Sequence, residues 1–176
     1  MRQLVFLFVF AAALYAQNQP KPPETLRGVL LEQLHTTQDQ EDWFVPIDVA
    51  VKGLTAEQAK WTSGKGNHSI GQLVNHLAFW NERSLQRFKG EKPAAFSGNN
   101  DETFNSFDAK SWAETTTRLD RVMKAWEQAV ETADEATLKK NASLIAHIGT
   151  HNAYHVGQII YVRKLQGSWN PANGVK

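Results

Sequence analysis

The chain lacks cysteine altogether, and its 19 Lys and Arg residues nearly balance its 18 Asp and Glu residues, for a formal net charge of +1. Without cysteine there is no disulfide scaffold, no thiolate zinc site, no redox pair and no cysteine nucleophile. The charge balance removes the clustered excess of Lys and Arg that neutralises phosphates, so we expect no nucleic-acid partner. Metal or acid–base chemistry must come from hydroxyls, carboxylates or the six histidines.

Several common sequence signatures are also missing. The glycines have the wrong spacing for a phosphate-binding loop, and there is neither a G-x-S-x-G elbow nor an H-E-x-x-H motif. Period-2 alternation and internal repeats are absent as well, which excludes a sheet-based or repeat architecture. The 176 residues, 41% hydrophobic and 21% charged, fit one globular domain.

The N-terminus has the pattern of a secretory signal peptide. Arg2 precedes an apolar run from Leu4 to Leu14, the small residues Ala11, Ala12, Ala13 and Ala16 offer cleavage sites, and a polar, Pro-rich stretch follows. The run is shorter than the about 20 apolar residues that a membrane-spanning helix needs. We therefore expect a signal peptide at residues 1–16, a Pro-rich junction at 17–23, a periplasmic or secreted location, and no stable membrane anchor after cleavage. An uncleaved N-terminal anchor is the alternative.

Helical periodicity dominates the rest of the sequence. It predicts a helix at 24–39, a break between Trp43 and Pro46 with a short helix to Val51, and further helices at about 69–89, 111–132 and 141–165. A long polar connection at 91–110 is of the kind that often covers a site. The sequence thus predicts an all-α four-helix bundle over residues 24–171.

Candidate metal ligands are concentrated in the last predicted helix. His147, His151 and His155 follow one another at i,i+4 spacing. His151 and His155 share a helix face with apolar residues, which predicts that the pair points into the bundle. The two steps from His147 to His155 spread the rings over about 12 Å, so one ion cannot easily reach all three histidines. Burying two imidazoles without partners costs roughly 1–3 kcal/mol apiece, which favours a compensating partner.

His76 is the third candidate ligand. It lies between Leu73 and Trp80, on the predicted inward edge of the second long helix. Facing helices of a bundle are a usual place to assemble a metal site, and three imidazoles leave coordination positions open, as in catalytic zinc sites. From the residues alone, hydrogen-bonded core histidines remain an alternative, since H-x-x-x-H pairs are common by chance.

Other residues have two interpretations each. Gln158 could hydrogen-bond a ligand imidazole or serve as a helix-packing amide, and Tyr154 could reach a substrate, although packing between helices is the favoured role. Trp80 could wall the pocket or belong to the core. We expect His35 at the surface and His68 in the loop or cap before the second helix, and neither as a ligand.

Two strings, GLTAEQAKWTSGKGNHSIGQLVNHLAFWNERSLQRF and HIGTHNAYHVGQIIYVRKLQG, together resemble the DinB-like superfamily of metal-dependent four-helix bundles. The resemblance extends over about residues 24–171. In that family one histidine of the second helix and an H-x-x-x-H pair of the fourth bind a divalent metal, which corresponds to His76, His151 and His155. The resemblance therefore implies a metal site at these three histidines, and it implies no DNA binding.

Members of the family include thiol-dependent S-transferases, so the resemblance implies a metal-dependent transferase, or a hydrolase, acting on a small-molecule substrate. Export argues against a thiol co-substrate, because abundant small thiols are mainly cytoplasmic. A non-catalytic metal-binding or structural bundle is the alternative. Three imidazoles suit Zn, Ni, Fe or Mn. A homodimer is compatible with these expectations.

Overall fold

The computed structural model describes residues 21–174, and this part of the chain is helical and contains no strand. The predicted signal peptide lies outside the described residues, as do residues 17–20 of the junction. The elements, in chain order, are α2 (Leu26–Gln38), α3 (Ile47–Val51), α4 (Ala56–Lys60), α5 (Ile70–Phe88), α6 (Asp101–Asn105), the 3-10 turn η1 (Ala109–Ser111), α7 (Trp112–Thr132), α8 (Glu135–Gln166) and the 3-10 turn η2 (Pro171–Asn173). The all-α prediction is confirmed.

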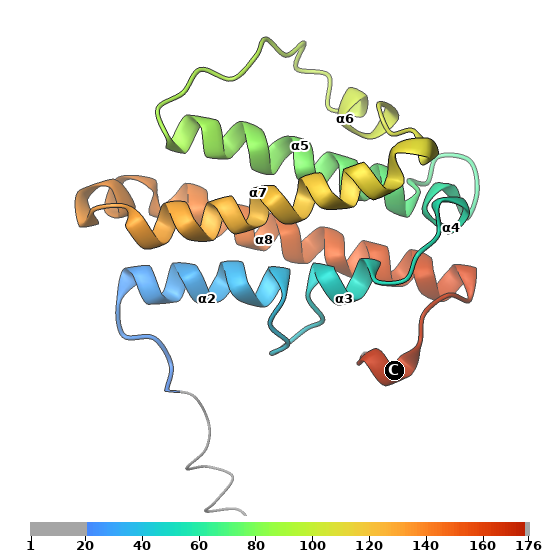
Figure 1. The fold of residues 1–176 in the computed structure, drawn as a ribbon, viewed down its shortest axis with the longest axis horizontal. Helices are drawn as coiled ribbons and strands as arrows, with labels where there is room; N and C mark the ends of the chain where they lie inside the picture. Colours follow the sequence, from blue (N-terminus) through green and yellow to red (C-terminus); the bar gives the residue numbers. More distant parts are fainter. Residues whose placement is uncertain (1–20, 175–176) are drawn as a thin grey trace, which may run out of the picture.

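The four longest of these helices pack side by side as a bundle (Figure 1). Helix α5 contacts α7 and α8, and α2 contacts the same two helices from the other side. Between them lie apolar side chains with almost no exposed surface, among them Leu77, Trp126, Ile145 and Ile159. Burial of this apolar surface is the main stabilising contribution, at roughly 25 cal/mol per Å². None of the described helices has the length and apolar character needed to cross a membrane.

Local sequence signals account for several helix ends. The Ser69 hydroxyl accepts a hydrogen bond from the Gln72 amide, and the Gln72 side chain accepts one from the Ser69 amide, so a capping box begins α5. Pro46 directly precedes α3, where a missing amide proton does no harm. Gly167 ends α8 in the left-handed conformation, with φ of 75°. The predicted break and both predicted caps are confirmed.

The start of α8 differs from the prediction. The helix begins at Glu135 rather than near residue 141, because the Asp134 carboxylate caps it by accepting a 2.7 Å hydrogen bond from the Thr137 amide. The added turns contain one large apolar residue, Leu138, which is fully buried, and one exposed alanine, Ala136. A single large apolar residue in two turns gives no periodic signal, although it is enough to hold the segment against the core.

The connection at 91–110 is also more ordered than predicted, since α6 and η1 form within it. Figure 1 shows it arching away from the end of α5 before α6 returns toward that helix. The ring of Phe107 lies directly over Gly71, where a Cβ atom would collide with it. The glycine therefore lets the segment that carries α6 pack tightly on the first turn of α5.

Helix α2 is attached to the α7–α8 turn by Arg27. The Arg27 guanidinium donates to the carbonyl oxygens of Val130 at 2.6 Å and Ala133 at 2.7 Å, and to the Glu135 carboxylate at 2.9 Å. Carbonyls at the end of α7 have no partner within their own helix, so the arginine satisfies them.

Candidate metal centre

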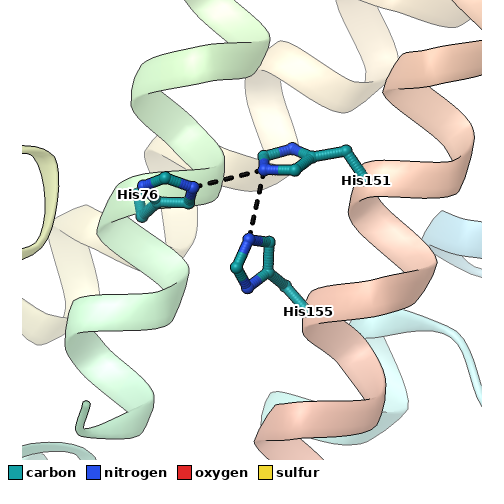
Figure 2. A group of neighbouring side chains, drawn as sticks. All are labelled: His76, His151 and His155. Carbon is teal, nitrogen blue, oxygen red and sulfur yellow. Dashed lines mark hydrogen bonds between the residues drawn. The ribbon is translucent and has the colours of Figure 1, made fainter. Parts of the chain in front are cut away.

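Three histidines from two helices converge at one point in the bundle. Figure 2 shows His76 of α5 facing His151 and His155 of α8. The Nε2 atom of His151 lies 3.2 Å from that of His76 and 3.1 Å from that of His155. His76 and His155 are buried, with 3% and 6% of their surface exposed, and His151 is half-buried. The structure thus brings together the three residues that the sequence singled out.

The hydrogen-bond partners of Nδ1 in His76 and His155 determine which ring nitrogen carries the proton. The Thr103 hydroxyl donates to the Asn100 carbonyl at 2.7 Å, so toward His76 it can only accept, and His76 Nδ1–H donates to it at 2.6 Å. His155 Nδ1–H donates to the Gln158 amide oxygen at 2.6 Å. In both rings the proton is on Nδ1, which leaves the Nε2 lone pair directed toward His151.

This proton arrangement fits a shared cation. His151 Nε2 carries at most one proton, so it can satisfy only one of the two lone pairs that face it. A neutral cluster leaves a buried acceptor without a donor, at a cost of about 1–3 kcal/mol. Ligands about 2.0–2.1 Å from a tetrahedral zinc lie about 3.3–3.4 Å from one another, close to the observed spacings. The three histidines could therefore hold one divalent ion.

Burial keeps the three rings in the neutral form that a metal requires. It lowers the pKa of His76 to about 3, with the neighbouring His155, His151 and His68 contributing. It lowers the pKa of His155 to about 4, against the opposing effect of the Gln158 hydrogen bond. Burial also lowers the pKa of His151. Neutral imidazoles do not have to lose a proton before they bind an ion.

A buried pair of amides sets the register between the two helices. The Asn81 side chain of α5 donates to the Asn152 side-chain oxygen of α8 at 2.8 Å. The backbone carbonyl of Asn81 in turn accepts a 3.0 Å hydrogen bond from the Trp126 indole of α7. Asn152 follows His151 directly in the chain, so this contact holds the two ligand-bearing helices at the level where the imidazoles meet.

The histidine cluster lines a pocket of about 550 Å³, a size typical of small-molecule sites. Apolar and aromatic side chains form much of its wall, including Leu144 and Ile148 of α8. The Trp80 indole donates to the Asn100 side chain at 3.1 Å, which ties α5 to the connection before α6 at the pocket. Trp80 thus forms part of the pocket wall.

The other singled-out residues on α8 take distinct positions. Of the two roles considered for Gln158, the structure shows the hydrogen bond with an imidazole, in which its amide oxygen accepts from His155 Nδ1–H. Tyr154 is 64% exposed and lines the pocket, so its favoured role in packing between helices was wrong. His147 lies outside the cluster and lines the same pocket, and its Nδ1–H donates to the Ser143 carbonyl at 2.7 Å.

Sequence reasoning missed two residues of α6. The Thr103 hydroxyl accepts the hydrogen bond from His76 Nδ1–H. The Phe104 ring stacks on His76 and on His68, with ring centroids 4.0 and 3.9 Å apart. His68 is exposed and belongs to the segment before α5, as predicted. The apolar side chain of Phe104 within a polar stretch was the available signal, but nothing in the sequence related it or Thr103 to His76.

An all-α bundle with three convergent imidazoles from two helices defines a class of proteins that could bind a metal ion in their core. The model of the DinB superfamily matches residues 47–159, and the chain belongs to this superfamily. The match runs from the first residue of α3 into α8 and includes all three histidines. Helix α2 packs in the bundle but precedes the matched segment. No curated protein and no solved structure matches the chain.

Proposed function

We propose that the protein binds a divalent metal through His76, His151 and His155 and is a metal-dependent enzyme, of transferase or hydrolase type, that acts on a small molecule. The observation that carries the proposal is the pair of Nε2 lone pairs, each fixed by a hydrogen bond behind its ring, that face the third imidazole. A divalent ion held by three neutral imidazoles supplies Lewis acidity, which lowers the pKa of a bound water toward roughly 7 or stabilises a thiolate.

The pocket supports an enzyme over a closed structural site. Its walls would bind the apolar part of a substrate and exclude water from the side of the histidines that they cover. The Tyr154 hydroxyl accepts a 3.1 Å hydrogen bond from Gln158, so its own proton can point toward a substrate. A structural site would fill the remaining coordination positions with protein groups.

His147 adds a proton acceptor to the pocket. Its Nδ1–H is engaged by the Ser143 carbonyl, so its Nε2 carries a lone pair. The ring is exposed and lies one turn before His151 on α8. It would take up a proton from a nucleophile that is activated at the metal and return it to a leaving group.

Metal content tests the site. The wild-type protein is expected to carry one ion at the three histidines, and the His151→Ala variant to lose it. His147→Ala is the matched control, because it removes an imidazole from the same helix outside the cluster, and it should retain the ion. Equal metal content in wild type and His151→Ala would overturn the site.

Cobalt substitution tests the enzyme class. An open coordination position predicts that the visible spectrum of the cobalt-loaded protein changes when a small thiol or a hydroxamate is added. An unchanged spectrum would indicate the non-catalytic alternative. Turnover of a thiol with an aromatic halide, compared with hydrolysis of nitrophenyl esters, then separates transferase from hydrolase.

The metal remains a choice among Zn, Ni, Fe and Mn, because three imidazoles suit all of them.

We also propose export to the periplasm or the exterior, supported by the pattern of residues 1–16. Detection of the mature N-terminus by mass spectrometry of the secreted or periplasmic fraction tests this location.

A further inference from the structure

A second group of possible ligands lies between α2 and α7, whereas the histidine cluster described above lies between α5 and α8. His35 and Asp39 are one turn apart at the end of α2, and Glu127 faces them from α7. One ligand atom from each of the three lies within 4.8 Å of the others. The spacing is short enough for a single ion to contact all three side chains.

The contact between His35 and Glu127 has the length of an ion pair but not the alignment of a regular hydrogen bond. His35 Nδ1 lies 3.1 Å from Glu127 Oε1, yet this buried oxygen receives no aligned N–H among the described residues. A short distance without an aligned N–H is expected for two ligands of one ion, because their lone pairs point toward the ion rather than toward each other. Ligand atoms about 2.0–2.1 Å from a tetrahedral zinc ion are separated by about 3.3–3.4 Å, close to the distance between these two atoms.

The surroundings carry a surplus of negative charge. Asp48 and Asp120 lie close enough to Asp39 to act on the same groups, and Lys124 is the cation among them. Lys124 is already engaged with both oxygens of Asp120, at 2.9 and 2.8 Å. Burial raises the pKa of Glu127 and the neighbouring carboxylate of Asp39 adds to this, whereas His35 beside it acts in the opposite direction. The four carboxylates outnumber Lys124 even when His35, which is paired with Glu127, is counted as a cation, and this favours the binding of a further cation.

A buried amide adds an oxygen without a donor. Gln38 has no exposed surface, and its amide nitrogen lies 3.4 Å from Asp120 Oδ1. Its Oε1 atom receives no hydrogen bond from the described residues. A buried carbonyl oxygen of this kind is costly unless a donor or a cation lies near it. Gln38 directly precedes Asp39 in the chain, at the end of α2 where the helix dipole favours positive charge.

We propose that His35, Asp39 and Glu127 form a second divalent-cation site, which ties the C-terminal end of α2 to α7. One imidazole and two carboxylates suit Zn²⁺, Mn²⁺ or Fe²⁺. The ion would neutralise the carboxylate surplus and give the lone pairs of His35 and Glu127 a common partner. The inference is independent of the function proposed for the histidine cluster, because it uses none of its residues.

Zinc stoichiometry tests the second site. Untagged protein, freed of metal with a chelator, is dialysed against Zn²⁺ and its bound zinc is measured by elemental analysis. The background is the His151→Ala, His155→Ala variant, which leaves a single imidazole of the first cluster. Two substitutions are made separately in this background variant, Glu127→Gln and Asp39→Asn. Asp39 is exposed, so its substitution leaves the core intact. Glu131→Gln, one turn further along α7, is the matched control.

The second site predicts one tightly bound zinc per chain in the background variant and in the Glu131→Gln control. Glu127→Gln and Asp39→Asn should each weaken that binding at least tenfold. The unfolding temperature should rise with zinc in the background variant and not after Glu127→Gln. Absence of zinc from the background variant, or equal binding after both ligand substitutions, would overturn the site.

The same measurements separate the two sites. If His151→Ala leaves the zinc content of the wild-type protein unchanged while Glu127→Gln lowers it, the second site stands and the histidine cluster fails. If His151→Ala alone removes all of the zinc, the histidine cluster stands and the second site fails.

Discussion

The replacement of Thr103 by valine tests how the metal centre is built. Thr103 is 2% exposed, and its hydroxyl joins His76 Nδ1 at 2.6 Å to the Asn100 carbonyl at 2.7 Å. Valine has nearly the same shape, so the change removes the hydroxyl and leaves the His76 proton buried without an acceptor. Such a loss costs about 1–3 kcal/mol of stability.

The effect on metal affinity should be larger than that of an ordinary core substitution. Without the hydroxyl, the His76 ring is free to change tautomer and orientation, and loss of such a partner lowers metal affinity by about 10–100-fold. Competition with a chromophoric chelator measures the affinity, and urea unfolding of the metal-free protein measures the stability.

Two further variants complete this test. Thr103→Ser keeps the hydroxyl and should restore most of the affinity. Thr115→Val is the matched control, because Thr115 is also buried but its hydroxyl bonds only to the Ser111 carbonyl, at 2.9 Å, on α7. If Thr103→Val binds metal as tightly as Thr115→Val does, the argument that the hydroxyl orients His76 is refuted.

Three more perturbations concern stability, each measured by urea unfolding of metal-free protein. Gly71→Ala should destabilise the fold by about 1–3 kcal/mol, because the new Cβ collides with the Phe107 ring. Asp134→Ala should cost about 1 kcal/mol, since the cap of α8 is lost. Burial lowers the pKa values of His76 and His155, so below pH 6.5 the unfolded chain takes up protons that the folded state excludes. Stability should therefore fall between pH 6.5 and 4, by at most about 1.4 kcal/mol per pH unit for each histidine.

Controls and contrary results differ among the three. Gly157→Ala is the control for Gly71→Ala, since a Cβ built there meets no atom within 4 Å beyond its own stretch of helix, and equal stability of the two variants would contradict the packing argument. Asp134→Asn should retain the cap, so a loss equal to that of alanine would contradict capping. A metal-free protein that becomes more stable as the pH falls from 6.5 to 4 would contradict the burial of neutral imidazoles.

Local chemistry let the sequence predict most of the long helices. Proline, serine and glycine act through the backbone of their own segment, so Pro46, Ser69 and Gly167 marked ends that the structure reproduces. The start of α8 was not predictable in this way. Its first turns depend on a cap at Asp134 and on Leu138 reaching the core, and the latter is a contact between distant segments.

The sequence by itself selected the three histidines, because i,i+4 spacing on one helix and an inward position on another are local properties of each helix. Tertiary structure decided what these residues can do. Only the packing of α6 on α5 brings Thr103 behind His76, and only the contact between α2 and α7 brings Glu127 to His35. The physical reason is that helical periodicity determines which face a residue occupies, whereas the residue across from it depends on how the helices pack.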